Sequence, residues 1–486
     1  MKLDNKFMAF AVALALSVCS LRAQTPQGAN QGSTSVSPDS PLPPIESTPV
    51  VRYGQTPTAD AGGISASSDS EPYQPVQAHP DTHPLSGAEL FSVGSLGKSR
   101  TIFDPSVFFT ETGTAGLDSQ ATLSNLLLLG GTLNIDHTWG VSNLVVSYRG
   151  GETLSYPHYS QNVQYHDLSV EDAVSWARLT LRVRDDLAVS PYAIFGGQGF
   201  GGPGMLGQLS ASSQTAMSST LVTSQIQTGL AMRLLDTALG EVDYQFSRRS
   251  AISFSASYGL LHFNNTGFID SRSLNSQAGF DYMLNAKNSI AVIGAYGTTN
   301  FQGSTGATND YIGQLAYGRK ITGRLALQVA AGPEQVQTKN VGAADFQFLS
   351  WSTNVAISYR RRRTDYSLYY THALSNGSGL LAGALSHTFS ASASRRLTRH
   401  WFGSVNGGYA LDNSLAVPTA PTSFSFTHWY GGSYVGRPVG RHMNVNFNYG
   451  VAHQRSPDTC PSSVCGGSGY VQTFGTTINW HLRRTE

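Results

Sequence analysis

The chain has 486 residues, of which only 13% are charged and 10% aromatic, with 51 glycines and a formal net charge of +1. This balance lacks the strongly basic domain that nucleic-acid binding requires, so no nucleic-acid partner is expected. The mean hydropathy of −0.17 excludes a helical membrane protein, and after the first residues no apolar run approaches the roughly 20 residues that a spanning helix needs.

Residues 1–23 have the composition of a secretory signal peptide. Lys2 and Lys6 supply a positive start, residues 7–18 form an apolar core, and residues 21–23 (Leu-Arg-Ala) fit a cleavage site. This order of features predicts export. A lipoprotein anchored at Cys19 would need a small residue before the cysteine, and Val18 is too large.

Residues 24–100 hold more than half of the chain's 21 prolines, among many Ser, Thr and Gln residues. Such a segment buries too little apolar surface to offset the entropy lost on ordering, so it is predicted to be a disordered periplasmic segment. His79 and His83 suggest a metal site, but Pro80 and Pro84 break any helix that would align them. We therefore interpret them as part of a solvated linker.

From residue 101 to residue 486 the chain reads as a series of strands separated by basic turns. The turns recur about every 40 residues, a period that also fits a propeller. Between two turns, however, only two alternating strands and one loose loop fit, which is the hairpin unit of an up-and-down barrel. The basic turns are residues 248–250, 285–288, 319–324, 360–363, 395–400 and 437–441.

The strands alternate between an apolar and a polar face. In residues 252–258, Ile252, Phe254 and Tyr258 alternate with serines, and in residues 443–449 Phe447 and Tyr449 alternate with asparagines. The last strand, residues 470–482, repeats this pattern. Lipid is the natural solvent for so many apolar faces, whereas a soluble sandwich or propeller would have to bury the polar ones.

Tyrosines near predicted strand ends suit a membrane interface, where one end of the ring is apolar and the other is wet. They are Tyr282, Tyr317, Tyr359, Tyr409 and Tyr449.

The turns between Ser250 and Arg484 delimit twelve strands, and the region before Ser247 adds four to six. The predicted fold is therefore all-β, a transmembrane up-and-down antiparallel β-barrel of 16 to 18 strands.

Two strands combine opposite charges on their polar faces. One places Arg178, Arg182 and Arg184 opposite leucine and valine, and a later one turns Glu241 and Asp243 inward. If residues 192–239 form one long outer loop, these strands are neighbours and a basic ladder faces an acidic one in the lumen. Opposed charges across a water-filled pore set up a transverse electric field, which selects charged or dipolar solutes. The alternative is pairing that only neutralises and stiffens the wall.

The long loop begins with a glycine-rich run at residues 196–204 and has room for a helix over residues 221–239. Gly197, Gly199 and Gly202 match the dinucleotide pattern by letter, but Pro203 stands where a phosphate-binding helix would begin. A mobile loop is predicted instead. Folded inward it would constrict a pore, and folded outward it would cap the surface.

Cys460 and Cys465 form a Cys-x4-Cys pair in a Pro, Ser and Gly context. In an oxidising compartment they are a candidate disulfide worth about 2 kcal/mol. Free thiols are the alternative, and without a second pair a zinc site is poorly supported.

Catalysis has little support in the sequence. No H-E-x-x-H, G-x-S-x-G or P-loop motif is present, and the adjacent His166 and Asp167 should point to opposite faces of a strand. We expect no catalytic residues, no metal, no cofactor and no enzymatic activity.

The signal peptide, alternating strands, tight turns and terminal strand together resemble outer-membrane β-barrel proteins of Gram-negative bacteria. Residues 164–169 with 182–186, and residues 257–263, are similar to recurring blocks in large porin-like barrels of that class. The resemblance covers roughly residues 100–486. It implies an outer-membrane location, lipid and the barrel-assembly machinery as partners, and no known active site.

The preferred hypothesis is a passive, porin-like channel for small hydrophilic solutes, with selectivity set by Arg178, Arg182, Arg184, Glu241 and Asp243. The alternative is a non-conducting scaffold or adhesion barrel plugged by its glycine-rich loop or its N-terminal segment. A barrel-embedded hydrolase comes third, since it requires a Ser, His and acidic constellation that the sequence does not reveal.

Overall fold

A computed structural model of the chain describes residues 100–116, 123–156, 163–190, 232–264, 268–302, 306–339, 345–375, 383–415, 425–440, 442–455 and 469–481. All of them belong to one compact unit, Thr48–Glu486. The predicted signal peptide, the proline-rich segment with His79 and His83, the glycine-rich run and both Cys460 and Cys465 lie outside the described residues. In these described ranges, no helix has the length and hydropathy to cross a membrane.

The described residues form eighteen long β-strands. In chain order they are β1 Arg100–Gly116, β2 Leu123–Trp139, β3 Ser142–Tyr156, β4 Val163–Ser175, β5 Leu179–Ser190, β6 Arg233–Gln245, β7 Ser250–Phe263, β8 Ser271–Asn285, β9 Asn288–Phe301, β10 Ala307–Lys320, β11 Leu325–Lys339, β12 Phe346–Arg361, β13 Thr364–Ser375, β14 Ala384–Arg396, β15 Phe402–Ser414, β16 Ser425–Val439, β17 Met443–Arg455 and β18 Gly469–His481.

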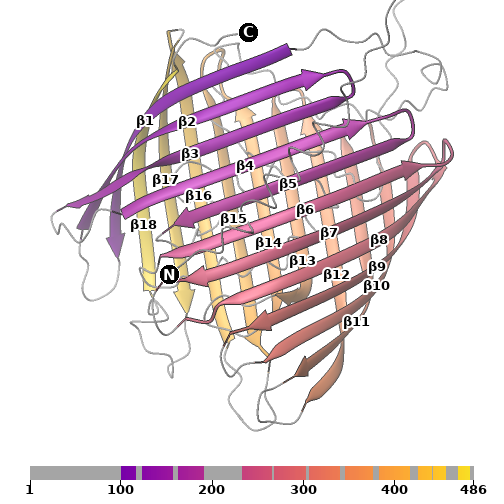
Figure 1. Cartoon of the computed structure of the whole chain (residues 1–486). Helices are drawn as coiled ribbons and strands as arrows, with labels where there is room; N and C mark the ends of the chain where they lie inside the picture. Colours follow the sequence, from indigo (N-terminus) through magenta and orange to yellow (C-terminus); the bar gives the residue numbers. More distant parts are fainter. Residues whose placement is uncertain are drawn as a thin grey trace, which may run out of the picture. The chain divides into compact units, whose positions relative to one another are not determined.

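Each strand pairs antiparallel with its neighbours in the chain, and the sheet closes where β1 pairs with β18. Figure 1 shows the result, with β3 to β8 crossing the near side and β13 to β17 behind them. The closing register runs from Ser106 opposite His481 to Gly116 opposite Val471. The prediction of an up-and-down barrel is confirmed, at the upper end of the predicted strand number.

The basic turns all lie at one rim, because each of them connects an even-numbered strand to the next odd-numbered one. Several are closed by a side-chain oxygen at the start of the turn. The Asn285 Oδ1 accepts the backbone N–H of Lys287 at 2.9 Å and of Asn288 at 3.0 Å. Thr322 and Thr398 accept the N–H groups two and three residues later in the same way. Short polar side chains thus encode these turns locally.

The alternation of faces sets the orientation of the barrel wall. Outward-facing apolar side chains are exposed, such as Leu315 at 70% and Phe474 at 50%, whereas the inward-facing Gln454 and Asn479 are buried. An outer surface this apolar is stable in lipid and unfavourable in water. The chain therefore folds as a membrane-spanning barrel of the outer-membrane type.

The predicted tyrosines all face outward, but not all lie at strand ends. Tyr282, Tyr317 and Tyr359 lie within three residues of the turn rim, each 37% exposed. Tyr409 and Tyr449 lie near the middle of β15 and β17. β15 continues five residues past its tyrosine and β17 six, because backbone pairing sets the length of a strand and does not depend on where its aromatic residues lie.

The long loop is shorter than predicted. β6 begins at Arg233, so residues 233–239 belong to a strand and not to a loop or helix. Leu235 and Leu239 face inward and are buried, so the expected outward apolar pattern does not mark the start of this strand. The backbone pairing of β6 with β5 nevertheless continues to Arg233, which stands opposite Ser190.

A charge placed on either face of β18 tests the orientation. We expect Phe474→Arg, in the middle of the outer face, to destabilise the barrel by about 2–4 kcal/mol, because it places a cation in lipid. Thr473→Arg, one residue away on the lumen side, is the matched control and should cost less than half as much. The measurement is unfolding by denaturant in lipid vesicles, and the readout is the gel mobility of the folded barrel. Equal losses would contradict the assigned faces.

Candidate functional site

Much of the lumen wall is polar and is held by short cross-strand hydrogen bonds. Ser106 and Thr132 hydroxyls lie 2.6 Å apart, Thr110 and Thr477 hydroxyls lie 3.0 Å apart, and Gln314 donates to the Ser352 hydroxyl at 2.9 Å. Such a surface suits water and polar solutes.

The two charged strands predicted to be neighbours are neighbours. In the register of β5 and β6, Arg182 stands opposite Glu241 and Thr180 opposite Asp243. The Arg182 guanidinium donates to Glu241 Oε2 at 2.8 Å, where the carboxylate is almost fully buried. A charge-assisted hydrogen bond of this kind is among the stronger polar contacts in proteins.

The pairing extends across a third strand. Glu171 on β4 lies 3.1 Å from the Nε of Arg182 and 3.8 Å from the NH1 of Arg184. Arg184 also donates through Nε to Asp186 at 2.7 Å. We call these residues, with Glu241 and Asp243, the charged ladder. Each of its two arginines contacts two carboxylates.

The sequence prediction missed two members of the ladder and included one residue that lies outside it. Asp186 lies in a run of charged residues, 184–186, that fits a turn as well as a strand end, and Glu171 shows only as one acidic residue in an alternating strand. Arg178 lies exposed in the turn before β5, where its carbonyl accepts the N–H of Gln245 at 2.8 Å. The structure therefore brings together Arg182, Arg184 and Glu241 but leaves Arg178 at the rim.

Two further arginines face the lumen near the ladder. The Arg149 guanidinium lies 4.5 Å from the centre of the Phe108 ring, in cation–π geometry, and stands opposite Asp167 in the β3–β4 register. Arg233 is buried at the loop end of β6. Sequence reasoning found neither, because each is an isolated charge in a mixed strand.

A second set of lumen charges lies on the arc from β8 to β15 and is acidic. Asp281, Asp310, Glu334 and Asp412 are all buried on the inner face. One oxygen of Glu334, Oε1, accepts the backbone N–H of Leu374 at 3.1 Å. We call these four residues the acidic arc.

Asp412 is also part of a small network that bears on catalysis. It accepts a hydrogen bond from the Ser386 hydroxyl, and its Oδ2 lies 3.7 Å from Nδ1 of His428. The carboxylate thus lies between the hydroxyl and the imidazole, whereas nucleophile activation needs the imidazole between the other two. Among the described residues, no three His, Cys, Asp or Glu side chains are placed to hold a metal ion.

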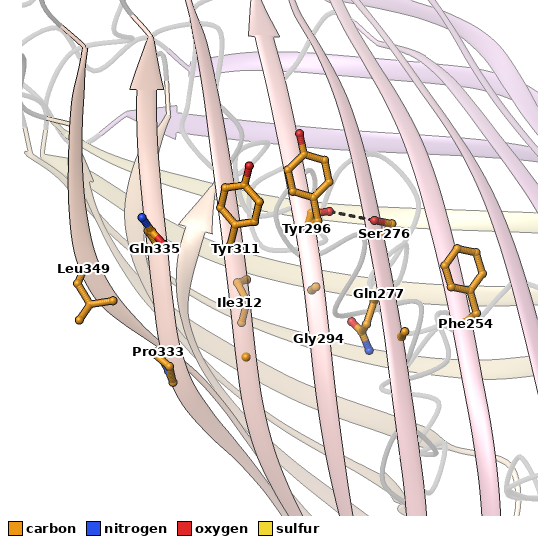
Figure 2. A pocket seen from close by; sticks show the side chains of 13 residues that line it. Phe254, Ser276, Gln277, Gly294, Tyr296, Tyr311, Ile312, Pro333, Gln335 and Leu349 are labelled. Atoms are coloured by element: carbon orange, nitrogen blue, oxygen red, sulfur yellow. Dashed lines mark hydrogen bonds between the residues drawn. The ribbon is translucent and has the colours of Figure 1, made fainter.

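A groove lies on the outer wall of β7 to β12 and not in the lumen (Figure 2). Phe254, Tyr311 and Leu349, which line it, belong to the lipid-facing set of exposed side chains. The Tyr296 and Tyr311 rings lie side by side with centroids 5.1 Å apart. Because it faces lipid, we do not assign this groove to solute binding.

No protein-family model matches the chain, and no curated protein matches it either. Among solved structures, it is similar to the outer membrane protein OpdK from Pseudomonas aeruginosa, with 10% identity and a TM-score of 0.40, covering 79% of this chain and 98% of that one. It is also similar to OccK2 (OpdF) from the same organism, which was solved in complex with glucuronate. There the identity is 8%, the TM-score 0.41, and the coverage 79% and 98%. The assignment of the fold rests on the strand pairing of this chain.

A double-mutant cycle tests whether the ladder is a coupled unit. We expect Arg182→Gln to cost about 2 kcal/mol, because it leaves the buried Glu241 carboxylate without its charged donor. Adding Glu241→Gln should restore part of the loss, with a coupling energy of about 1 kcal/mol or more in denaturant unfolding. Arg178→Gln, in the turn, should change stability by less than about 0.5 kcal/mol. Additive effects of the two ladder variants would contradict direct pairing.

Proposed function

We propose that this protein is a passive channel for small hydrophilic solutes in the outer membrane. The observation that supports the proposal most directly is the inward-facing charged ladder, built across β4, β5 and β6 behind an apolar outer wall. Export by residues 1–23, a periplasmic segment over residues 24–100 and a disulfide between Cys460 and Cys465 belong to the same proposal.

The chemistry of the wall supports transport over simple anchoring. A barrel that served only as an anchor has no need of charges in its interior, and removing charged groups from water is costly unless they are paired. The ladder instead spans three strands with both signs of charge. In a narrow aqueous lumen, such fixed charges produce a transverse field that orients charged and dipolar solutes.

One observation favours the second candidate, a non-conducting scaffold. Several polar side chains on the inner face have almost no exposed surface, such as Glu334 and His428 at 0% and Gln454 at 1%. An inner wall with so little access to water also fits a filled lumen.

Planar-bilayer recording separates the two candidates. We expect refolded protein to give steady, ohmic current steps, because ions can cross a water-filled lumen. In the Arg184→Gln variant, which breaks the ladder, the step size or ion preference should change by roughly twofold. Arg319→Gln is the matched control, since Arg319 is exposed on the outer face near the turn rim.

A barrel whose fold is verified by gel mobility but that gives no steps would reject the channel and favour the scaffold. Steps of identical size and ion preference in wild type and Arg184→Gln would keep the channel but remove the ladder from its selectivity.

A further inference from the structure

We propose that the lumen selects for cations and that the transported solutes carry a positively charged group, such as an ammonium or guanidinium. This inference rests on the proposed channel function and deepens it. It follows from two facts about the lumen charges, namely that the ladder arginines are matched by carboxylates and that the acidic arc adds only negative charge. The eight carboxylates of the ladder and the arc outnumber the four lumen arginines, which are the two of the ladder together with Arg149 and Arg233.

The ladder arginines have little attraction left for an anion. Arg182 lies at 2.8 Å from Glu241 and 3.1 Å from Glu171, and Arg184 lies at 2.7 Å from Asp186 and 3.8 Å from Glu171. Three carboxylates thus surround two guanidinium groups, and Asp243 follows on the same face of β6. An entering anion would have to displace a paired carboxylate, so the ladder presents a surface that is neutral to negative.

The acidic arc has no comparable basic residues on its own strands. From β8 to β15, the described lumen-facing positions between the two rims include Asp281, Asp310, Glu334 and Asp412 but no lysine or arginine. The basic side chains on these strands that share the inner face are at the turn rim, where Arg360 pairs with Asp365 at 3.0 Å. The field along this arc is therefore negative.

Asp310 and Glu334 form the centre of the arc. They lie on the adjacent strands β10 and β11, where Glu334 stands opposite Ile312, two residues from Asp310. Asp310 extends over Gly297 of β9, and a methyl group on that glycine would overlap its Oδ1. The missing side chain of Gly297 makes the space that this carboxylate occupies.

The Glu334 carboxylate has one buried oxygen without a hydrogen-bond partner among the described residues. Its side chain is 0% exposed, Oε1 accepts the Leu374 N–H, and Oε2 has no hydrogen-bond partner among the described residues. A buried carboxylate oxygen of this kind is costly unless a donor or a cation reaches it. The unpaired oxygen is itself buried, so Glu334 acts on a solute through its charge, and an ammonium or guanidinium group, which carries only donors and a positive charge, is the group that this charge attracts.

The test measures the reversal potential of single channels in a potassium chloride gradient. We expect wild type to prefer K⁺ over Cl⁻. Asp310→Asn and Glu334→Gln, which keep side-chain size but remove charge, should each lower the permeability ratio by about two- to threefold. The effect should shrink at 1 M salt, where the screening length falls to about 3 Å from about 10 Å at 0.1 M.

The matched control is Glu111→Gln. It removes the same charge, but Glu111 is exposed on the outer face of β1, so the permeability ratio should not change. As a second readout, lysine should enter proteoliposomes faster than glutamate, and Asp310→Asn should reduce that difference.

The outcomes separate this inference from the channel proposal. A conducting wild type that prefers Cl⁻, or a permeability ratio that is the same in wild type and both lumen variants, overturns cation selection and leaves the channel intact. A correctly folded wild type without current overturns the channel itself.

Discussion

The structure depends on one constraint, which is that every backbone N–H and C=O group in the membrane needs a partner within the protein. Lipid offers no hydrogen bonds, so an open sheet edge would leave a row of costly unpaired groups. The pairing of β1 with β18 removes both edges at once. The strand alternation, the rim turns and the placement of the lumen charges all depend on that closed sheet.

Closure gives each side chain one of two environments, and the charged residues follow from it. On β5, Val183 faces lipid while Arg182 and Arg184 face the lumen, although the three are consecutive in the chain. The antiparallel register then determines which charges meet. Arg182 reaches Glu241 because β5 and β6 pair, even though 59 positions separate the two residues along the chain.

Much of the fold could be predicted from sequence, because the signals that encode it are local. Period-two alternation identifies the lipid face of β7, β17 and β18, and turn-closing residues such as Asn285 and Thr322 mark the rim. The start of β6 was missed because its inward Leu235 and Leu239 are apolar and hide the alternation.

The candidate site was predicted only in part, since it depends on register. The pairing of Arg182 with Glu241 followed from strand order. Arg178 was predicted to lie on the strand, whereas it is the last residue of the turn before β5. Glu171 and the acidic arc could not be found, because single acidic residues on separate strands carry no sequence signal. Only the sheet brings Asp310 beside Glu334 and over Gly297.

The closing seam also has a kinetic meaning. The hydroxyls of Thr110 and Thr477 meet across 367 positions of chain, whereas each hairpin joins strands that are neighbours in sequence. Contacts of such long range form slowly, because a large loop entropy is lost before they contribute. The first and last strands therefore each keep one edge unpaired, although β1 also pairs with β2 and β18 with β17, until nearly all of the wall exists. During that interval the nascent barrel exposes two unpaired strand edges, which can pair with other chains. The seam is therefore the point at which aggregation competes with assembly.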